Sequence, residues 1–231
     1  MSVVFKLFEK MDSKRWHLCC LLFFVVSCKS PPAYNSYADA EKDSVKTEQI
    51  AQRVFRQLDS LTTIIRNGDL ITRTGNDNTS EILRQFNQTD PTYSHCGIAS
   101  FENDSLFVYH ALGGDFNPDQ KIRRDPFILF CDPYSNRGIG IFRYKLAAPE
   151  KALLLSTVQS FYKNGLMFDL EFNLKTDDRM YCAEFIYKAL LLASKNKLAF
   201  HISHIKDFEF ISVDDLFLQP LCVPVKRIFY K

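Results

Sequence analysis

The sequence has no excess of charge once its first 27 residues are set aside. Those residues hold four bases and two acids, and removing them from the totals of 29 Lys/Arg and 27 Asp/Glu leaves 25 of each. A chain of neutral charge exerts no general attraction on a polyanion, so we expect no nucleic-acid partner. The sequence also lacks internal repeats, and its 231 residues, 46% of them hydrophobic, suit one globular domain with a sizeable core.

Long apolar runs and strong metal-binding motifs are absent as well. The N-terminal apolar run, Leu18–Val26, has nine residues, whereas a membrane-spanning helix needs roughly 20. His201 and His204 are spaced so that they could share a helix face, but no carboxylate-containing motif such as HExxH accompanies them. A surface or loop role is therefore favoured over a metal site, and we expect neither a metal nor a cofactor.

The first 28 residues have the order of an export signal. Basic residues between Lys6 and Arg15 precede the apolar run, which ends in a small residue followed by Cys28. This order resembles the bacterial lipoprotein signal, in which that cysteine is acylated and becomes the mature N-terminus. The resemblance implies a lipid anchor at Cys28 and a place in the cell envelope. In proteins with this signal, an aspartate directly after the acylated cysteine favours retention in the inner membrane. Lys29 stands at that position here, so the resemblance favours the outer membrane, with the domain facing the periplasm. An uncleaved anchor or an ordinary export signal is the alternative.

This reading divides the chain into three segments. Residues 1–27 are the signal peptide, the polar and Pro/Ser-rich residues 28–44 are a tether, and residues 45–231 form the domain. Four cysteines remain in the domain, and an oxidising compartment would allow them three pairings. Their spacing selects none of these, and a chain of this length does not need disulfides. The four are Cys96, Cys131, Cys182 and Cys222.

Apolar periodicity and turn residues predict an α+β fold with an antiparallel sheet packed with helices. Two strands with the turn residues Asn103 and Asp104 between them read as a β-hairpin. The predicted helices are 45–64, a short one within 76–87, 149–164, one with its first turn at Cys182, and 213–218. The predicted strands are 69–75, 92–101, 105–112, 138–146, 208–212 and 222–231.

Cys182 stands where an amphipathic helix begins. A thiol in the first turn of a helix has a lowered pKa, because free N–H groups and the helix dipole stabilise the thiolate. The alternative is a small apolar residue at the end of a core helix, since free cysteine is often buried.

Two histidines lie on the strands of the predicted hairpin. The turn would set His95 and His110 roughly opposite one another, so they could supply a base and the group that orients it. Cys96 would point to the opposite face from His95 and could not pair with it. The charged segment Lys121–Asp125 reads as a solvated run, the alternative being contact with a substrate carboxylate.

Four short motifs together carry a resemblance to a known family. They are "GDLI" (68–71), "YSHCGI" (93–98), "VYHA" (108–111) and "YCAEF" (181–185). In this order they resemble the circularly permuted papain-like amidases of the YaeF/YiiX type, within the NlpC superfamily of cysteine peptidases and related to the lecithin:retinol acyltransferase-like enzymes. The resemblance implies a permuted papain-like fold with Cys182 as nucleophile, His95 as base and His110 as third polar residue. The sequence departs from the family in having Cys96 in place of Val, and His110 where the YiiX group often has Glu.

The expected function is that of a lipid-anchored envelope cysteine hydrolase. It would cleave an amide bond in a small peptide through a thioester intermediate, and a peptide derived from peptidoglycan is one candidate substrate. The Cys182 N–H would be the first oxyanion donor, and Tyr93 and Tyr181 are the candidate substrate-binding residues. A lipid acyl hydrolase or acyltransferase with the same residues is a second reading. A non-catalytic envelope binding domain is a third.

Overall fold

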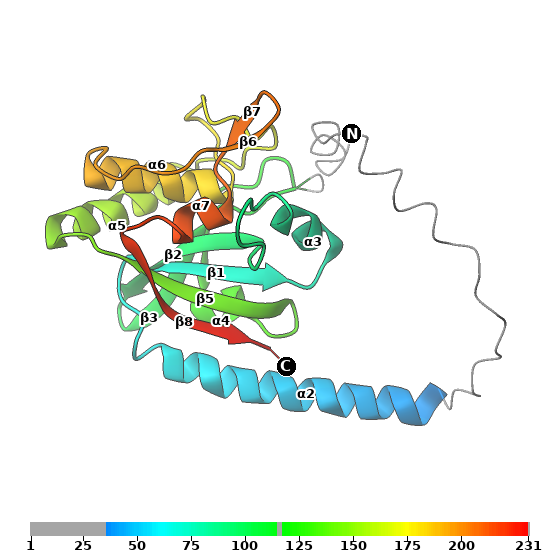
Figure 1. Ribbon diagram of the computed structural model, residues 1–231. Coiled ribbons are helices and arrows are strands. Elements are labelled where there is room, and N and C mark those ends of the chain that lie inside the picture. The colour runs from blue at the N-terminus through cyan, green and yellow to red at the C-terminus, as the bar shows by residue number, and fades with distance from the viewer. Residues whose placement is uncertain (1–35, 115–116, 231) are drawn as a thin grey trace.

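A six-stranded antiparallel sheet organises the protein in a computed structural model that describes residues 36–114 and 117–230 (Figure 1). The strand order is β4-β3-β2-β1-β5-β8, and a separate hairpin holds β6 and β7. The predicted signal peptide and Cys28 lie outside the described residues. The strands are β1 Leu70–Gly75, β2 His95–Glu102, β3 Ser105–His110, β4 Arg123–Pro126, β5 Asn136–Tyr144, β6 Ser203–Ile205, β7 Phe208–Phe210 and β8 Cys222–Phe229.

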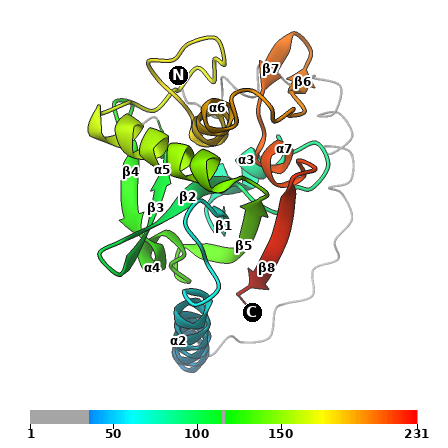
Figure 2. The ribbon, with the colours of Figure 1, turned by 90° about the vertical axis from the view of Figure 1, so that its left-hand side faces the viewer.

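Helices cover both faces of the sheet (Figures 1 and 2). Alternate residues of one strand face opposite sides, so that Leu70 of β1 packs into one apolar cluster and Ile71 into another. The first cluster includes α5 (Ala148–Lys163), α6 (Cys182–Ser194) and α7 (Val213–Phe217). The second includes α2 (Ser36–Leu61) and α4 (Phe127–Phe130), and a short helix, α3 (Asn78–Arg84), follows β1. The predicted α+β class with an antiparallel sheet packed with helices is confirmed.

The β2–β3 hairpin forms around the predicted turn. Glu102 pairs with Ser105, which leaves Asn103 and Asp104 as a two-residue loop with φ of 48° and 62°. Positive φ at both loop residues is the geometry whose twist matches that of the flanking strands, and Asn and Asp tolerate it well. The loop fixes the register of the whole hairpin.

Helix α6 begins at Cys182, in agreement with its predicted first turn. The side chain of Glu184 turns back so that Oε2 accepts a hydrogen bond from the Tyr181 N–H at 3.2 Å. This bond satisfies one of the N–H groups that a helix start leaves free. The helix ends at Ser194 and is followed by Lys195, whose φ of 53° is left-handed. Its buried face includes the apolar residues Ala183, Phe185, Ile186, Ala189, Leu190 and Ala193.

Two segments differ from their predictions, and two short elements, α4 and β6, were not predicted. Helix α2 starts at Ser36, so part of the predicted tether is helical. Residues 36–44 contain Ala, Glu and Lys, which favour helix, but have little apolar periodicity to indicate it. The second segment is Arg123–Pro126, predicted as a solvated charge run, which forms the edge strand β4 beside β3. A four-residue strand of charged residues with a terminal proline has no alternating apolar pattern to detect.

Candidate active site

The first residue of β2 and the last residue of β3 bring two imidazoles together. His95 Nε2 lies 2.9 Å from His110 Nδ1, and both rings pack against Phe130. Because Ile98 pairs with Tyr109, the histidines are diagonal neighbours across the hairpin, within the predicted cross-strand reach. The diagonal contact depends on Gly97, where an added Cβ would stand 3.0 Å from His110 Cβ and 2.4 Å from Val108 Cγ1.

A carboxylate that the sequence did not reveal completes this row of side chains. His110 Nε2 lies 3.0 Å from Asp125 Oδ2, and Arg123 Nη2 lies 2.8 Å from the same oxygen. Asp125 and Arg123 both come from β4, the segment that was wrongly predicted to be a solvated run. The only available signal was the identity of Asp125 itself, because the pairing of β4 with β3 has no sequence pattern.

The row of hydrogen bonds fixes which nitrogens carry protons. Burial opposes ionisation of Asp125, but hydrogen bonds from His110 and Arg123 outweigh it and hold the carboxyl pKa below its usual value. Asp125 is therefore an acceptor, and His110 Nε2–H donates to it. Burial also lowers the pKa of His110 to about 4, so the ring is neutral at pH 7 and its Nδ1 accepts from His95 Nε2–H. His95 Nδ1 then carries the lone pair that a general base needs.

His95 itself is neutral at pH 7. Burial, followed by the positive charge of Arg73, lowers its pKa well below 6.5. The sequence predicts a Cys182 thiolate stabilised by both the helix start and a neighbouring imidazolium. The second part of this prediction is wrong, because the His95 ring is neutral at pH 7. The ring is set up to accept a proton and not to hold one in the resting state.

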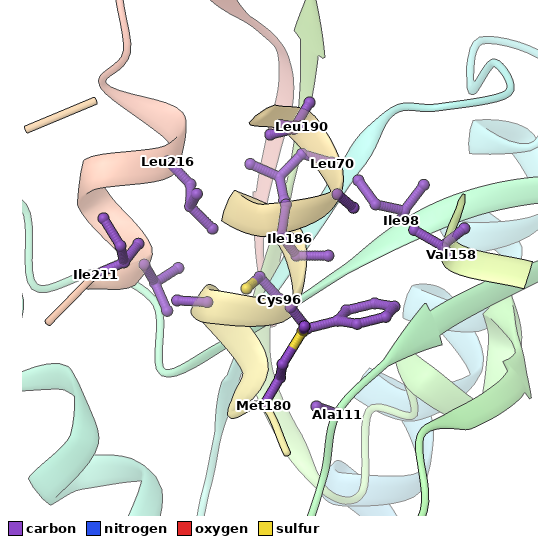
Figure 3. Packing of buried hydrophobic residues seen from close by; sticks show 14 of the residues in the cluster. Leu70, Cys96, Ile98, Ala111, Val158, Met180, Ile186, Leu190, Ile211 and Leu216 are labelled. Atoms are coloured by element: carbon purple, nitrogen blue, oxygen red, sulfur yellow. The ribbon is translucent and has the colours of Figure 1, made fainter. Parts of the chain in front are cut away.

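Cys182 is half-buried at the first position of α6. Its pKa is lowered chiefly by a hydrogen bond from the Cys96 thiol, against burial, with the backbone N–H groups of Ala183 and Cys96 also contributing. Cys96 packs into the apolar cluster that includes α6 (Figure 3), on the opposite side of the sheet from the Phe130 ring that His95 contacts, as predicted. There its thiol hydrogen-bonds to the candidate nucleophile Cys182. The sequence indicates no role for Cys96, so it did not reveal this contact with Cys182.

Cys182 and His95 line a single pocket of about 70 Å³. Tyr181 lines it too, with its ring against Phe172 at a centroid distance of 4.8 Å. His110 is not among the lining residues and lies behind His95, where its partners are His95 and Asp125. The structure thus places the predicted nucleophile and base in one cavity, with the third polar residue supporting the base.

The prediction that Tyr93 binds substrate is wrong. Its side chain is fully buried, with the ring packed edge-on against Phe142 and Phe217, and it does not line the pocket. Burial raises the pKa of its hydroxyl to about 12. Tyr93 precedes β2 and faces the core, so it is not a candidate for contact with substrate.

The remaining predicted positions lie away from this pocket. His201 Nδ1 lies 2.7 Å from Asp215 Oδ1, and His204 is exposed on β6, 3.9 Å from Glu209. Among the described residues, no group of three or more His, Cys, Asp and Glu side chains could hold a metal ion. The four domain cysteines are free. Over the same residues, no helix has the length and apolarity needed to cross a bilayer.

Comparisons with known proteins find a similar fold among the solved structures. No protein-family model matches the sequence, and a search of curated proteins finds no match. The fold is similar to the crystal structure of the metalloprotein YiiX from Escherichia coli O157:H7. The TM-score is 0.57 at 19% identity, over 71% of this chain and 98% of that one. At this identity the likeness shows a shared YiiX-like fold.

The pocket residues do not fit the metal that the word metalloprotein implies for that neighbour. His95 Nε2 and His110 Nδ1 point at each other, and His110 Nε2 points at Asp125. Ring nitrogens engaged in this way do not converge on an ion, whereas a protein zinc site needs three or four converging ligands.

Proposed function

We propose that the protein is a lipid-anchored cell-envelope cysteine hydrolase that cleaves an amide bond through an acyl-enzyme. One observation supports this best: the Asp125–His110–His95 row ends in the pocket that Cys182 lines at the start of a helix. The chain order, base first and nucleophile last, is the order of the circularly permuted papain-like enzymes that the sequence motifs resemble. The YiiX-like fold is compatible with that architecture.

The geometry suits general-base catalysis with a thiol nucleophile. His95 Nδ1 takes the Cys182 proton as Sγ attacks the carbonyl carbon, and the Cys182 N–H donates to the developing oxyanion. His95 then gives the proton to the departing amine, and the carbon–nitrogen bond breaks to leave a thioester. Water, deprotonated by His95, cleaves the thioester and returns the thiol. Through these steps His110 and Asp125 keep His95 oriented and stabilise its transient positive charge.

Two other readings use the same residues differently. A lipid acyl hydrolase or acyltransferase would share the nucleophile and base, and the apolar lining of the pocket favours an apolar acyl group. A non-catalytic binding domain would not need the row of three side chains that supports His95. Within the leading reading, a small peptide remains the proposed substrate.

Selective alkylation tests the proposed nucleophile. Limited iodoacetamide at pH 6 to 7, read out by peptide mass spectrometry, should label Cys182 first, because its pKa is lowered. Burial raises the pKa of Cys96, Cys131 and Cys222, so these three should react slowly. His95→Ala should slow labelling by about tenfold or more, whereas the matched variant His204→Ala, at an exposed site, should not change it.

The pH dependence of the same reaction provides a second check. Protonation of His95 removes the base, and its pKa lies below 6.5. Any loss of rate caused by protonation of His95 should therefore appear only below pH 6.5, and the difference in rate between the native protein and His95→Ala should be undiminished at that pH. Equal labelling of all four thiols, or a disulfide at Cys182, would favour the binding-domain reading.

A further inference from the structure

The pocket next to Cys182 has a mainly apolar lining. Six aromatic rings contribute to it: Phe86, Phe168, Phe172, Tyr181, Phe208 and Phe210. No Lys, Arg, Asp or Glu is present among the described residues that line it. Its polar side chains are Asn87, Ser94, His95 and Ser212.

Most of those polar groups are already satisfied within the protein. Asn87 Nδ2 donates to the Tyr93 carbonyl at 2.7 Å, and its Oδ1 accepts from the Asp214 N–H at 3.2 Å. Ser94 Oγ accepts from the Gly75 N–H at 3.1 Å. A charged group bound here would lose its hydration and would meet no charged side chain among the described lining residues, which costs several kcal/mol in an apolar setting.

The charged side chains near the site lie outside this pocket. A hollow of about 490 Å³ adjoins it, sharing Phe172 and Phe208. Asp207, Glu209 and Lys175 line that hollow. A polar part of a substrate can therefore lie beyond the two phenylalanines, while the part next to the thiol meets a mainly apolar lining without charged side chains.

We infer that the acyl group transferred to Cys182 is uncharged and apolar, and that the aromatic pocket is its binding site. This inference rests on the proposed function, because it concerns the group that stays on sulfur in the thioester. The cavity of about 70 Å³ is roughly half of the 150 Å³ that accommodates benzene in a dry engineered cavity. It fits about three or four carbon atoms, and a longer chain extends past Phe172 and Phe208. Acyl groups bearing a carboxylate near the carbonyl, such as γ-glutamyl groups, are disfavoured.

A series of 4-nitrophenyl esters tests the inference on the full chain. The acyl group is varied through acetyl, butyryl, hexanoyl and the anionic glutaryl, with one constant leaving group. Two buried methylenes at about 0.8 kcal/mol each correspond to roughly a 15-fold rise in kcat/KM from acetyl to butyryl. The gain in kcat/KM should level off beyond butyryl. The kcat/KM of the glutaryl ester should be at least about tenfold lower than that of the hexanoyl ester. A second series with constant butyryl and varied alkyl leaving groups should show little dependence on leaving-group length.

A charge-insertion variant distinguishes pocket binding from general hydrophobic attraction. Leu83 is half-buried on α3 and lines the pocket, whereas Leu192 is exposed on α6 outside it. Leu83→Arg should raise the ratio of kcat/KM for the glutaryl ester to kcat/KM for the hexanoyl ester by about tenfold. Leu192→Arg should leave this ratio unchanged. Equal rates for all acyl groups, a preference for glutaryl in the native protein, or dependence on the leaving group alone would overturn the inference.

Failure of the proposed function gives a different result. Acid-quenched protein should carry the acyl mass on Cys182, and Cys182→Ala should lose it. If no ester acylates Cys182, the enzyme proposal fails together with the inference. If Cys182 is acylated with no acyl preference, the enzyme proposal stands and only the inference fails.

Discussion

Asp125 determines the direction of the hydrogen bonds between the two histidines. As an ionised acceptor, it requires His110 to donate through Nε2, which leaves His110 Nδ1 to accept from His95. The row therefore sets the tautomer of His95, although Asp125 contacts only His110 of the two histidines. This makes Asp125 a positioning residue of the proposed site.

Replacing Asp125 with asparagine tests that role. In Asp125→Asn the amide Nδ2 can donate to His110 Nε2, which reverses both tautomers and places a proton on His95 Nδ1. We expect kcat/KM for the butyryl ester to fall by between about tenfold and 10⁴-fold, the upper figure being that of a comparable carboxylate-to-amide change in a serine protease.

The matched variant is Asp177→Asn, whose carboxylate is exposed and pairs with Lys188. It should keep the rate within about twofold. Asp125→Glu should restore part of the activity while keeping the acid limb below pH 6.5, which a purely structural role would not predict. A rate for Asp125→Asn within twofold of the native protein would contradict the assignment.

At the scale of elements, the β2–β3 hairpin holds the two histidines at a fixed offset. The offset follows from the two-residue loop at Asn103 and Asp104 and from the absence of a side chain at Gly97. An added Cβ at Gly97 would meet the Tyr109 carbonyl oxygen at 2.8 Å, in addition to the Val108 and His110 contacts. Backbone atoms cannot move aside without separating the strands.

Gly97→Ala should therefore affect both stability and the site. Overpacking of this kind costs about 1–3 kcal/mol of the free energy of unfolding, measured by urea denaturation. Iodoacetamide labelling of Cys182 should also slow, because separated strands no longer hold His95 against His110. The control is Gly114→Ala, where an added Cβ has no neighbour within 4 Å. Equal stability of the two variants would show that the strands accommodate the methyl group.

These elements differ in how well the sequence predicts them. The hairpin and α6 are predictable because alternation, turn residues and helical apolar spacing are local signals. β4 is not, because an edge strand of Arg, Arg, Asp and Pro is specified by its pairing with β3 and not by its own pattern. The Asp125–His110 contact depends on that pairing, so the sequence could suggest two members of the row and not the third.

At the scale of the whole molecule, the candidate site joins the two apolar layers. His95 and His110 contact Phe130 of the layer that contains α2 and α4, whereas Cys182 and Cys96 belong to the layer that contains α6. Cys182 and His95 meet at one pocket because His95 is the first residue of its strand. No local pattern predicts this meeting of distant segments. From the sequence, only the resemblance of the four motifs to a known family implied that Cys182 and the two histidines belong to one site.

The lipid anchor is a separate prediction of the whole chain. The sequence order of basic residues, apolar run, small residue and Cys28 predicts acylation at Cys28. Each buried methylene of an acyl chain contributes about 0.8 kcal/mol to membrane binding, so loss of the lipids should release the protein. In Cys28→Ser we expect the protein to move from the membrane pellet to the supernatant after ultracentrifugation and to lose incorporation of labelled palmitate.

Cys19→Ser is the matched control, because Cys19 lies in the apolar run that the signal peptidase would remove with the signal. It should leave both sedimentation and palmitate incorporation unchanged. The released Cys28→Ser protein should still hydrolyse the soluble butyryl ester at the native rate, because the site consists of residues from β2, β3, β4 and α6. Membrane association that persists in Cys28→Ser would show that another part of the chain holds the protein to the bilayer, and the lipoprotein reading would then be wrong.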